Sequence, residues 1–178
     1  MYLVFCGYSF ISRKEYSLLD SMYDAVIVGA GISGSVCAKI LAENDYRVIL
    51  VDREIPPRDK VCSGVQLNYM EKIIGKRIPE EVLCRNKLRR VHLETPSGKA
   101  LEGNMSLLNY WRRKFDFWLN KLAIDAGADT LWGSAVSDIK VSGDSVSLKV
   151  GNDEIKSRYI LRIGMEDFRE ILCLSNAV

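Results

Sequence analysis

Hydrophobic positions near the start of the chain fall into two short runs that predict strands. The first run covers residues 23–28 and reads Tyr-Asp-Ala-Val-Ile-Val, and the second covers residues 47–51 and stops at Asp52. Continuous apolar and β-branched runs of this length are typical of strands buried in a parallel sheet. Between them, residues 35–44 predict a helix that begins with small side chains and ends before Asp45. This order of strand, helix and strand predicts a βαβ unit.

The remainder of the chain alternates between predicted strands and two further helices. Apolar side chains recur at helical spacing over residues 113–126, and Gly127 is placed to end that helix. A shorter helix is predicted over residues 66–74, and a hairpin around residues 96–98. The predicted strands cover residues 88–93, 99–101, 130–131, 136–141, 145–150 and 154–160. The pattern therefore predicts an α/β fold with a parallel sheet and a small β-rich insertion around residues 88–110.

A glycine-rich turn joins the first predicted strand to the first predicted helix. It reads Gly29-Ala30-Gly31-Ile32-Ser33-Gly34. In such a turn the first glycine allows the tight bend, the second admits a pyrophosphate, and the third lets the helix pack on the strand. The helix N-terminus offers N–H groups to the phosphates, and Asp52 is placed to accept hydrogen bonds from ribose hydroxyls. The turn predicts dinucleotide binding; the alternative is a glycine-rich turn without a ligand.

Composition and charge exclude several classes of protein but do not indicate a function. The chain has 178 residues and a net charge of +2, which is too weak a bias to favour nucleic acid as a partner. Its five cysteines are scattered and it has one histidine, so we expect neither a disulfide framework nor a metal site. No apolar run reaches the roughly 20 residues that span a bilayer. We expect a cytoplasmic protein, with residues 1–21 as an N-terminal extension.

Three segments resemble a known family of flavoproteins. Residues 24–53 resemble the N-terminus of flavoproteins with two dinucleotide-binding domains. Residues 60–64, Lys-Val-Cys-Ser-Gly, resemble the Lys-x-Cys-Gly-Gly loop of the geranylgeranyl reductase family, with Ser63 in place of a glycine. Residues 112–119 resemble the Arg-x-x-Phe-Asp-x-x-Leu segment of the same family, and residues 125–128 match its helix end. The resemblance covers residues 23–160.

The resemblance implies a fold, a cofactor and an activity. It implies a Rossmann-like FAD-binding domain over residues 22–160 that holds FAD without a covalent bond. It further implies that flavin hydride reduces isoprenoid double bonds of lipids, with NAD(P)H or ferredoxin as electron donor. The implied substrate is an isoprenoid or prenyl lipid, which allows peripheral contact with a membrane. The oligomeric state is left open.

The same resemblance assigns roles to individual residues. Arg112 is expected at the FAD phosphates or ribose, and backbone groups near Val136 at the adenine; the alternative for Arg112 is a solvated basic run. Cys62 is expected near the flavin ring as a candidate catalytic thiol, with Lys60 as a nearby positive charge, although an inert cysteine is equally compatible with the sequence. The predicted cofactor-binding residues are Gly29, Ala30, Gly31, Ile32, Ser33, Gly34, Asp52, Arg53, Cys62, Ser63, Gly64, Arg112 and Val136.

The chain departs from the family after residue 160. Residues 161–178 do not follow the family's Gly-Ala-Asp-Gly pattern, which predicts a truncated member with an incomplete FAD-binding domain and an off-pattern tail. Two alternatives stay open: a monooxygenase of the aromatic hydroxylase type, and a non-catalytic dinucleotide-binding fragment.

We expect His92 to be structural or exposed rather than catalytic, and the aromatic group Trp111, Phe115 and Trp118 to serve helix packing. The basic side chains between residues 72 and 90 are expected to form a solvated face, with contact to anionic lipid as the alternative.

Overall fold

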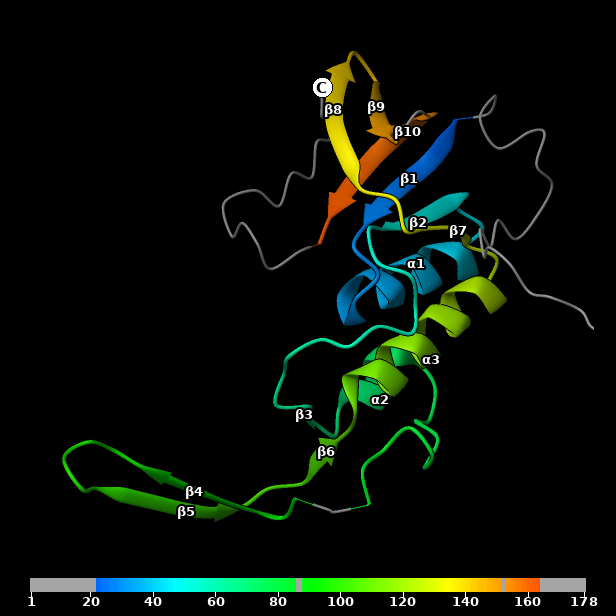
Figure 1. The fold of residues 1–178 in the computed structure, drawn as a ribbon. Coiled ribbons are helices and arrows are strands. Elements are labelled where there is room, and N and C mark those ends of the chain that lie inside the picture. Colours follow the sequence, from blue (N-terminus) through cyan, green and yellow to red (C-terminus); the bar gives the residue numbers. More distant parts are fainter. Residues whose placement is uncertain (1–21, 86–87, 152, 164–178) are drawn as a thin grey trace, which may run out of the picture. The chain divides into compact units, whose positions relative to one another are not determined.

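The computed structural model describes residues 22–163, apart from residues 86–87 and 152 (Figure 1). The predicted N-terminal extension, residues 1–21, and most of the predicted tail, residues 164–178, lie outside the described residues. The described part divides into two compact units, which are considered separately. The first contains residues 22–56 and 119–163, and the second contains residues 57–118.

A six-stranded sheet forms the centre of the first unit. Its strands lie in the order β7-β2-β1-β10-β9-β8. Strands β7, β2, β1 and β10 run parallel, whereas β10, β9 and β8 form an antiparallel meander. The bounds are β1 Tyr23–Val28, β2 Val48–Asp52, β7 Asp129–Trp132, β8 Val136–Ser142, β9 Ser145–Val150 and β10 Asp153–Arg162.

The mixed sheet confirms the predicted α/β class and adds an antiparallel part to the predicted parallel sheet. Only Gly143 and Asp144 separate β8 from β9, and a link this short closes a hairpin but cannot make the crossover that parallel strands need. Strand β10 runs two residues beyond residue 160, where the family resemblance ends. Its Arg162 is in register with Val28, so the start of the off-pattern segment is still part of the sheet beside β1.

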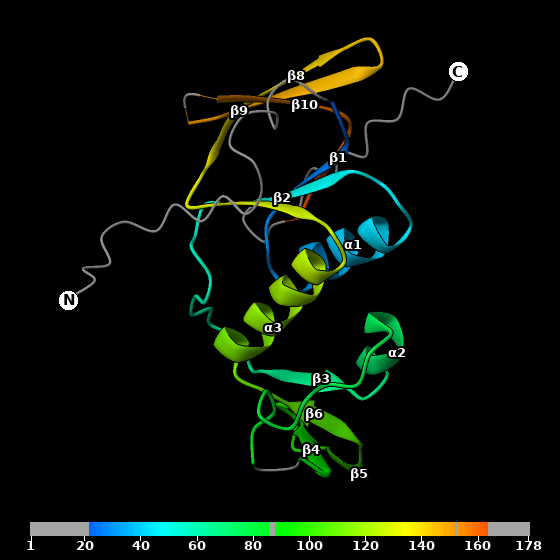
Figure 2. The same cartoon turned by 90° about the vertical axis from the view of Figure 1, so that its right-hand side faces the viewer.

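Two helices supply the apolar cover of one sheet face. Helix α1 spans Ile32–Glu43 and helix α3 spans Arg112–Asp125 (Figure 2). Small side chains allow close packing here: Ala38 of α1 and Ala123 of α3 are fully buried in one cluster with Ile27 of β1 and Leu50 of β2. A second cluster joins β1 and β2 to β9 and β10 through side chains that include Val26, Ile49, Leu148 and Ile160. The sheet is therefore apolar on both faces near its centre.

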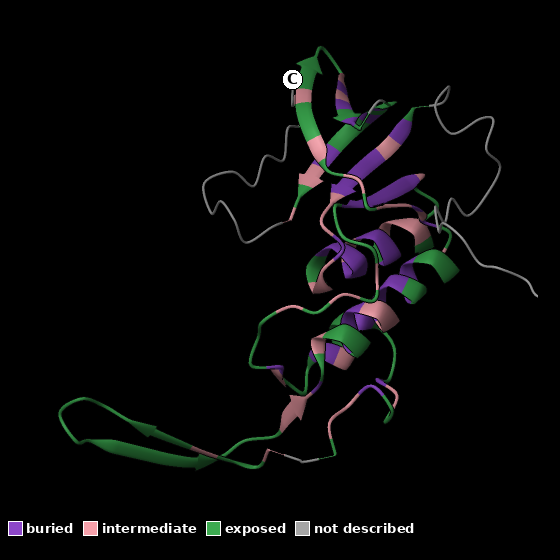
Figure 3. Cartoon of the chain, in the orientation of Figure 1, coloured by how far each residue is buried: buried purple, intermediate pink, exposed green. Residues whose placement is uncertain are grey.

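The second unit is larger than the predicted insertion and contains short elements. Its bounds are β3 Val65–Leu67, α2 Met70–Ile74, β4 Arg90–Glu94, β5 Ala100–Asn104 and β6 Leu107–Asn109, followed by the first half of α3. The predicted hairpin is confirmed as β4 and β5, which Figure 3 draws exposed along almost their whole length. The predicted helix over residues 66–74 is too long, because β3 pairs with β6 and leaves only Met70–Ile74 helical.

Two absences concern the described residues alone. Among residues 22–163, with the gaps named above, no helix has both the length and the apolar character needed to cross a bilayer. In the same part of the chain, no group of three histidine, cysteine or acidic side chains is arranged to hold a metal ion.

Candidate functional site

The glycine turn after β1 is shaped by close contacts of the backbone. Gly29 has φ +108°, and its N–H donates to the carbonyl oxygen of Val51 at 2.8 Å. A Cβ on Gly29 would overlap the carbonyl oxygen of Ile163, and a Cβ on Gly34 would overlap the carbonyl oxygen of Gly29. These two positions therefore require glycine for the fold itself, because a side chain on either would collide with backbone rather than with a movable side chain.

Gly31 differs from the other two glycines of the turn. Its φ of −77° and ψ of −169° are accessible to any residue, so its backbone conformation does not demand glycine. Gly31 is the N-cap of α1, and its carbonyl oxygen accepts the N–H of Ser35 at 3.0 Å. No side chain caps this helix end by a hydrogen bond, and the first turn contains no acidic residue. The first-turn N–H groups of such a helix are suited to an anion.

Both the N–H and the carbonyl oxygen of Ala30 form hydrogen bonds with side chains. Its N–H donates to Oδ2 of Asp52 at 2.6 Å. Its carbonyl oxygen accepts from Nδ2 of Asn120 at 3.1 Å and lies 3.3 Å from the hydroxyl of Ser35. All three partner side chains are buried. The bend of the turn is thus fixed by side chains from β2, α1 and the second half of α3.

Asp52 occupies the predicted position at the end of β2, but it already has backbone partners. Oδ2 accepts from Ala30, and Oδ1 accepts the N–H of Glu54 at 2.9 Å. The carboxylate is only 7% exposed. Its first effect is therefore to tie the glycine turn to the end of β2. A carboxylate oxygen can accept more than one hydrogen bond, so the predicted ribose contact is compatible with this arrangement.

The link between β7 and β8 lies next to the end of β2. The N–H of Ser134 donates to the carbonyl oxygen of Asp52 at 3.0 Å, and the N–H of Gly133 donates to that of Glu54 at 3.4 Å. Val136, at the start of β8, follows this link by two residues and is half-buried. Arg53 is exposed immediately after Asp52. The structure thus places residues 29–34 and Asp52 at the carboxyl ends of β1 and β2, with Arg53 directly after them.

In the second unit a buried carboxylate organises the predicted basic run. Asp116 accepts two hydrogen bonds from Arg112, from Nε to Oδ1 and from Nη2 to Oδ2, each at 2.7 Å. Nη2 of Arg58 lies 3.9 Å from the same carboxylate. Arg113 donates instead to Asp59 at 2.9 Å on the surface. These pairs give the positive charges at the start of α3 partners within the chain, so the unfavourable interaction with the helix dipole is offset.

Cys62 is exposed in the loop before β3, and its surroundings favour the thiolate. A hydrogen bond from the N–H of Gly64 lowers the pKa of Cys62, and the guanidinium of Arg112 lowers it further. The sequence predicted this positive charge at Lys60; in the structure Arg112 acts on the thiol. A thiol with a lowered pKa is the more reactive form of cysteine at neutral pH. The structure thus brings Cys62, Gly64 and Arg112 together, whereas Ser63 is exposed between them.

Gly64 also has a structural role that the motif does not reveal. It has φ +66°, and a Cβ there would overlap the carbonyl oxygen of Tyr110. Tyr110 returns a hydrogen bond from its N–H to the carbonyl oxygen of Gly64 at 2.9 Å. Its ring stacks on that of Phe115 with 3.9 Å between centroids, and burial raises the pKa of Tyr110 to about 12. The close approach of these backbones positions the Cys62 loop beside the start of α3.

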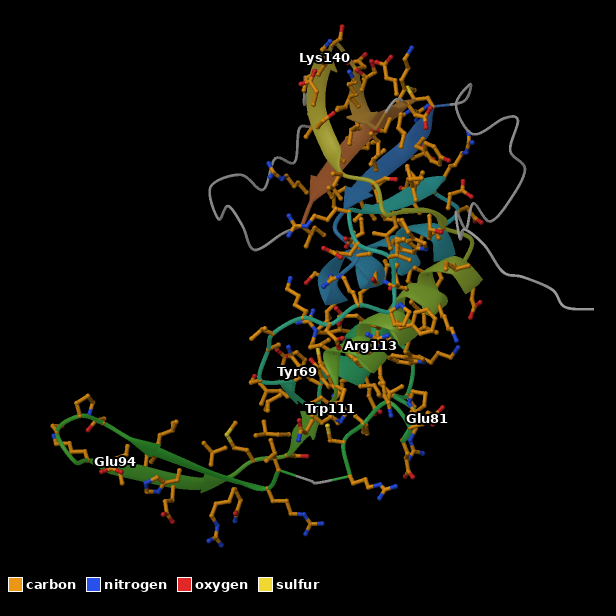
Figure 4. All side chains as sticks on the ribbon, viewed as in Figure 1. Tyr69, Glu81, Glu94, Trp111, Arg113 and Lys140 are labelled. Atoms are coloured by element: carbon orange, nitrogen blue, oxygen red, sulfur yellow. The ribbon has the colours of Figure 1, made fainter. Side chains whose placement is uncertain are left out.

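The residues expected to be structural behave differently from one another. Phe115 is fully buried and packs against Trp118, as predicted for helix packing. Trp111, labelled in Figure 4, directly precedes α3 and is 67% exposed, so it does not fulfil the predicted packing role. His92 is exposed on β4, where Nδ1 lies 2.8 Å from Oε1 of Glu102 on β5. The exposed position of His92 is one of the two placements that the sequence predicted.

Sequence reasoning missed three residues that the structure brings into these sites. Ser35 and Asn120 hold the glycine turn, and Asp116 holds Arg112. Asn120 lies 90 residues from Ala30 in sequence, so no local pattern announces their contact. Two signals were available in the sequence. Asn120 is a polar residue beside Leu119 in a predicted amphipathic helix, and Arg112 and Asp116 have the i,i+4 spacing that allows an ion pair on a helix.

Comparison with known proteins supports the dinucleotide-binding fold. Residues 27–56 match the NAD(P)-binding Rossmann-like domain family. An uncharacterized protein of Methanosarcina barkeri is 30% identical over 140 residues, which is 78% of this chain and 36% of that protein. Digeranylgeranylglycerophospholipid reductase 1 of Methanopyrus kandleri is 34% identical over 109 residues, which is 60% of this chain and 28% of that protein. The chain therefore spans about a third of the length of these curated relatives.

Solved structures share the fold at lower identity. A geranylgeranyl bacteriochlorophyll reductase-like protein of Thermoplasma acidophilum superposes with a TM-score of 0.69 at 21% identity, over 79% of this chain and 38% of that one. The halogenase PltM in complex with phloroglucinol and FAD gives a TM-score of 0.64 at 20% identity, over 80% of this chain and 34% of that one. The comparisons confirm the predicted resemblance: this chain has a dinucleotide-binding Rossmann-like fold and is similar, over about a third of their length, to proteins of the geranylgeranyl reductase family.

Proposed function

We propose that the chain binds FAD, with the diphosphate at the N-terminus of α1 and the adenosine beside the end of β2. The observation that carries the proposal is the helix end at Gly31, which has neither a capping side chain nor an acidic first turn. The adjoining bend is fixed by Asp52 and Asn120. A bound diphosphate would accept the first-turn N–H groups without displacing a protein carboxylate. FAD is also present in the PltM complex, which shares this fold.

Within the first unit each proposed contact follows from the placement of the residue. The backbone from Gly29 to Gly34 would surround the diphosphate, with the lack of a side chain on Gly31 allowing its close approach. Asp52 would accept from the adenosine ribose, and the exposed Arg53 beside it would lie at the same end of β2. The start of β8 at Val136 would contact the adenine through its backbone, because the preceding residues are bonded to the backbone at Asp52.

Within the second unit the family resemblance supplies the proposed roles. Arg112 would bind the FAD phosphates or ribose, since a guanidinium has five N–H donors and Asp116 receives two of them. Cys62, Ser63 and Gly64 would approach the flavin, and the thiol of Cys62 would be the chemically active group of this loop. The lowered pKa of Cys62 supports this role because it favours the thiolate, which is polarisable and electron-rich. The exposed position of Cys62 leaves this sulfur accessible on the surface of the unit.

For the protein as a whole we propose an FAD-dependent reductase that acts on isoprenoid double bonds. The support is the similarity to digeranylgeranylglycerophospholipid reductase 1 of Methanopyrus kandleri. When bound, reduced flavin supplies the hydride for such a reaction. The residues proposed above to bind FAD would hold the cofactor for this reaction. The electron donor, NAD(P)H or ferredoxin, and contact with a membrane surface stay predictions from the resemblance.

The binding proposal is tested by titrating the purified 178-residue chain with FAD and following the quenching of flavin fluorescence. We expect saturable binding, and we expect Gly31→Val to reduce the affinity at least about tenfold because its side chain would occupy the path of the diphosphate. The variant should keep a urea midpoint close to that of the parent, since φ at Gly31 suits any residue. An affinity that is unchanged in Gly31→Val would contradict the assignment of the turn.

The activity proposal is tested by assaying the protein with a geranylgeranyl lipid and a reductant in the absence of oxygen. Saturation of the lipid's double bonds, followed by mass spectrometry, is the expected result. We expect Cys62→Ser to lower turnover more than FAD affinity. Oxygen-dependent NADPH use with hydroxylation of an aromatic substrate would favour the monooxygenase alternative instead. Tight FAD binding without either reaction would favour the non-catalytic dinucleotide-binding alternative.

A further inference from the structure

A buried side-chain amide on α3 forms hydrogen bonds with residues of the glycine turn and of α1. Asn120 is 2% exposed, and Nδ2 donates to the carbonyl oxygen of Ala30 at 3.1 Å and to the hydroxyl oxygen of Ser35 at 2.7 Å. The orientation of the amide follows from its partners, because a carbonyl oxygen can only accept and must therefore face the NH₂ group. Both donors of Asn120 are thus used within the first unit.

The hydroxyl of Ser35 extends this contact to the next peptide. Oγ of Ser35 accepts from Asn120 and donates to the carbonyl oxygen of Gly31 at 2.8 Å. The same carbonyl oxygen accepts the N–H of Ser35 at 3.0 Å. Asn120 therefore fixes two successive carbonyl groups of the turn, that of Ala30 directly and that of Gly31 through Ser35.

The direction of these carbonyl groups determines the direction of the N–H groups that a diphosphate would use. In a trans peptide the carbonyl of one residue and the N–H of the next point in opposite directions. Since the carbonyls of Ala30 and Gly31 point toward buried side chains, the N–H groups of Gly31 and Ile32 point the other way. Asn120, bonded to the carbonyl of Ala30 directly and to that of Gly31 through Ser35, therefore holds two donors in a fixed direction before any ligand arrives.

We propose that Asn120 is a positioning residue that orients the diphosphate-binding peptides of the glycine turn. The inference rests on the proposed function, because it concerns the affinity of that same turn for a nucleoside diphosphate. Asn120 would not touch the ligand; it would act through Ala30 and Ser35. Preorganised donors bind more tightly than donors that must be ordered on binding, so loss of the amide should weaken ligands that carry a diphosphate.

The decisive variant is Asn120→Asp, which keeps the shape of the side chain and replaces the donor by an acceptor. Its carboxylate would face the carbonyl oxygen of Ala30 and turn an attraction into a repulsion. Asn44→Asp is the matched control, because Nδ2 of Asn44 also donates to a helix carbonyl, that of Ile40 at 2.8 Å, but on the exposed end of α1. Both variants remove one amide donor and add one negative charge to the full chain.

The measurement is the affinity of each folded variant for FAD, ADP and adenosine, by fluorescence titration and by competition. For Asn120→Asp we expect a loss of at least about tenfold for FAD and ADP but less than about twofold for adenosine, which lacks the diphosphate. We expect the ADP affinity of Asn120→Asp to recover as the pH falls, because a protonated carboxyl regains a donor. Asn44→Asp should bind all three ligands like the parent and show no such recovery.

Ser35→Ala provides a second test that does not place a charge in the core. It removes the link from Asn120 to Gly31 and leaves the bond to Ala30, so we expect a smaller loss of ADP affinity, about two- to fivefold. It keeps the proposal testable if Asn120→Asp does not fold.

Three results would count against these proposals in distinguishable ways. If the parent binds FAD but folded Asn120→Asp and Ser35→Ala bind it equally well, the positioning role is wrong and the proposed function stands. If the ADP and adenosine affinities fall together, Asn120 acts only on the stability of the unit. If the parent binds neither FAD nor ADP, the proposed function fails and the positioning role fails with it.

Discussion

The glycine turn and the Cys62 loop use polar groups in opposite ways. In the turn, Asp52 and Asn120 are buried and are bonded to the backbone of Ala30. In the loop, Cys62 is exposed, and the N–H of Gly64 together with the guanidinium of Arg112 lowers the pKa of its thiol. The glycine turn thus keeps a fixed backbone shape, whereas the Cys62 loop leaves a reactive thiol accessible to solvent. Buried hydrogen bonds are rigid because breaking one leaves an unsatisfied partner.

The largest effect is expected from a side chain added inside the rigid region. Gly29→Ala places a Cβ against the backbone carbonyl of Ile163 in a conformation with φ +108°. We expect a loss of about 1–3 kcal/mol or more in the free energy of unfolding, measured by urea denaturation. Gly103→Ala on the exposed strand β5 is the control, since nothing lies within 4 Å of a Cβ there.

The control should be neutral or slightly stabilising, because alanine has less chain entropy to lose than glycine. Equal stabilities of Gly29→Ala and Gly103→Ala would show that the turn tolerates the added side chain and is not held rigidly.

An intermediate effect is expected on the reactivity of Cys62. Because the N–H of Gly64 and the guanidinium of Arg112 lower the pKa of Cys62, we expect its alkylation by iodoacetamide to reach half its maximal rate at a lower pH than that of an ordinary thiol. Burial raises the pKa of Cys37 on α1, so the alkylation midpoint of Cys37 should lie at a higher pH than that of an ordinary thiol. Peptide-resolved mass spectrometry measures both rates in one sample, with Cys62→Ser to confirm the assignment.

Two arginine variants sharpen this prediction. Arg112→Gln removes a charge that favours the thiolate, so the alkylation midpoint of Cys62 should shift to higher pH. Arg113→Gln removes the neighbouring charge, which is paired with Asp59 on the surface, and should leave the midpoint in place. The same shift in both variants would mean that general charge, and not the placement of Arg112, sets the reactivity of this loop.

The smallest effect is expected from the exposed hairpin. His92 and Glu102 form a pair on β4 and β5 whose side chains are half or more exposed. Such surface pairs contribute about 0–1 kcal/mol, so His92→Ala should change the free energy of unfolding by no more than that and leave FAD affinity unchanged. A larger loss on urea denaturation would show that the hairpin is more tightly coupled to the core than its exposure indicates.

Elements whose signals are local could be predicted from the order of the residues. The apolar runs of β1 and β2 and the spacing of Gly29, Gly31 and Gly34 placed the βαβ unit, because burial and turn geometry act on neighbouring residues. The helix over residues 113–126 was predicted to within one residue at each end. The hairpin at residues 96–98 followed from its turn residues in the same way.

Which distant groups share a site became clear from the folded structure alone. It gave Asp52 two backbone partners, chose Arg112 over Lys60 as the charge beside Cys62, and brought Asn120 to the glycine turn. It also extended the sheet by an antiparallel meander and carried β10 to Arg162. The physical reason is that hydrogen bonds and charges act over a few ångströms, and segments about 90 residues apart reach that distance only when the apolar core is assembled.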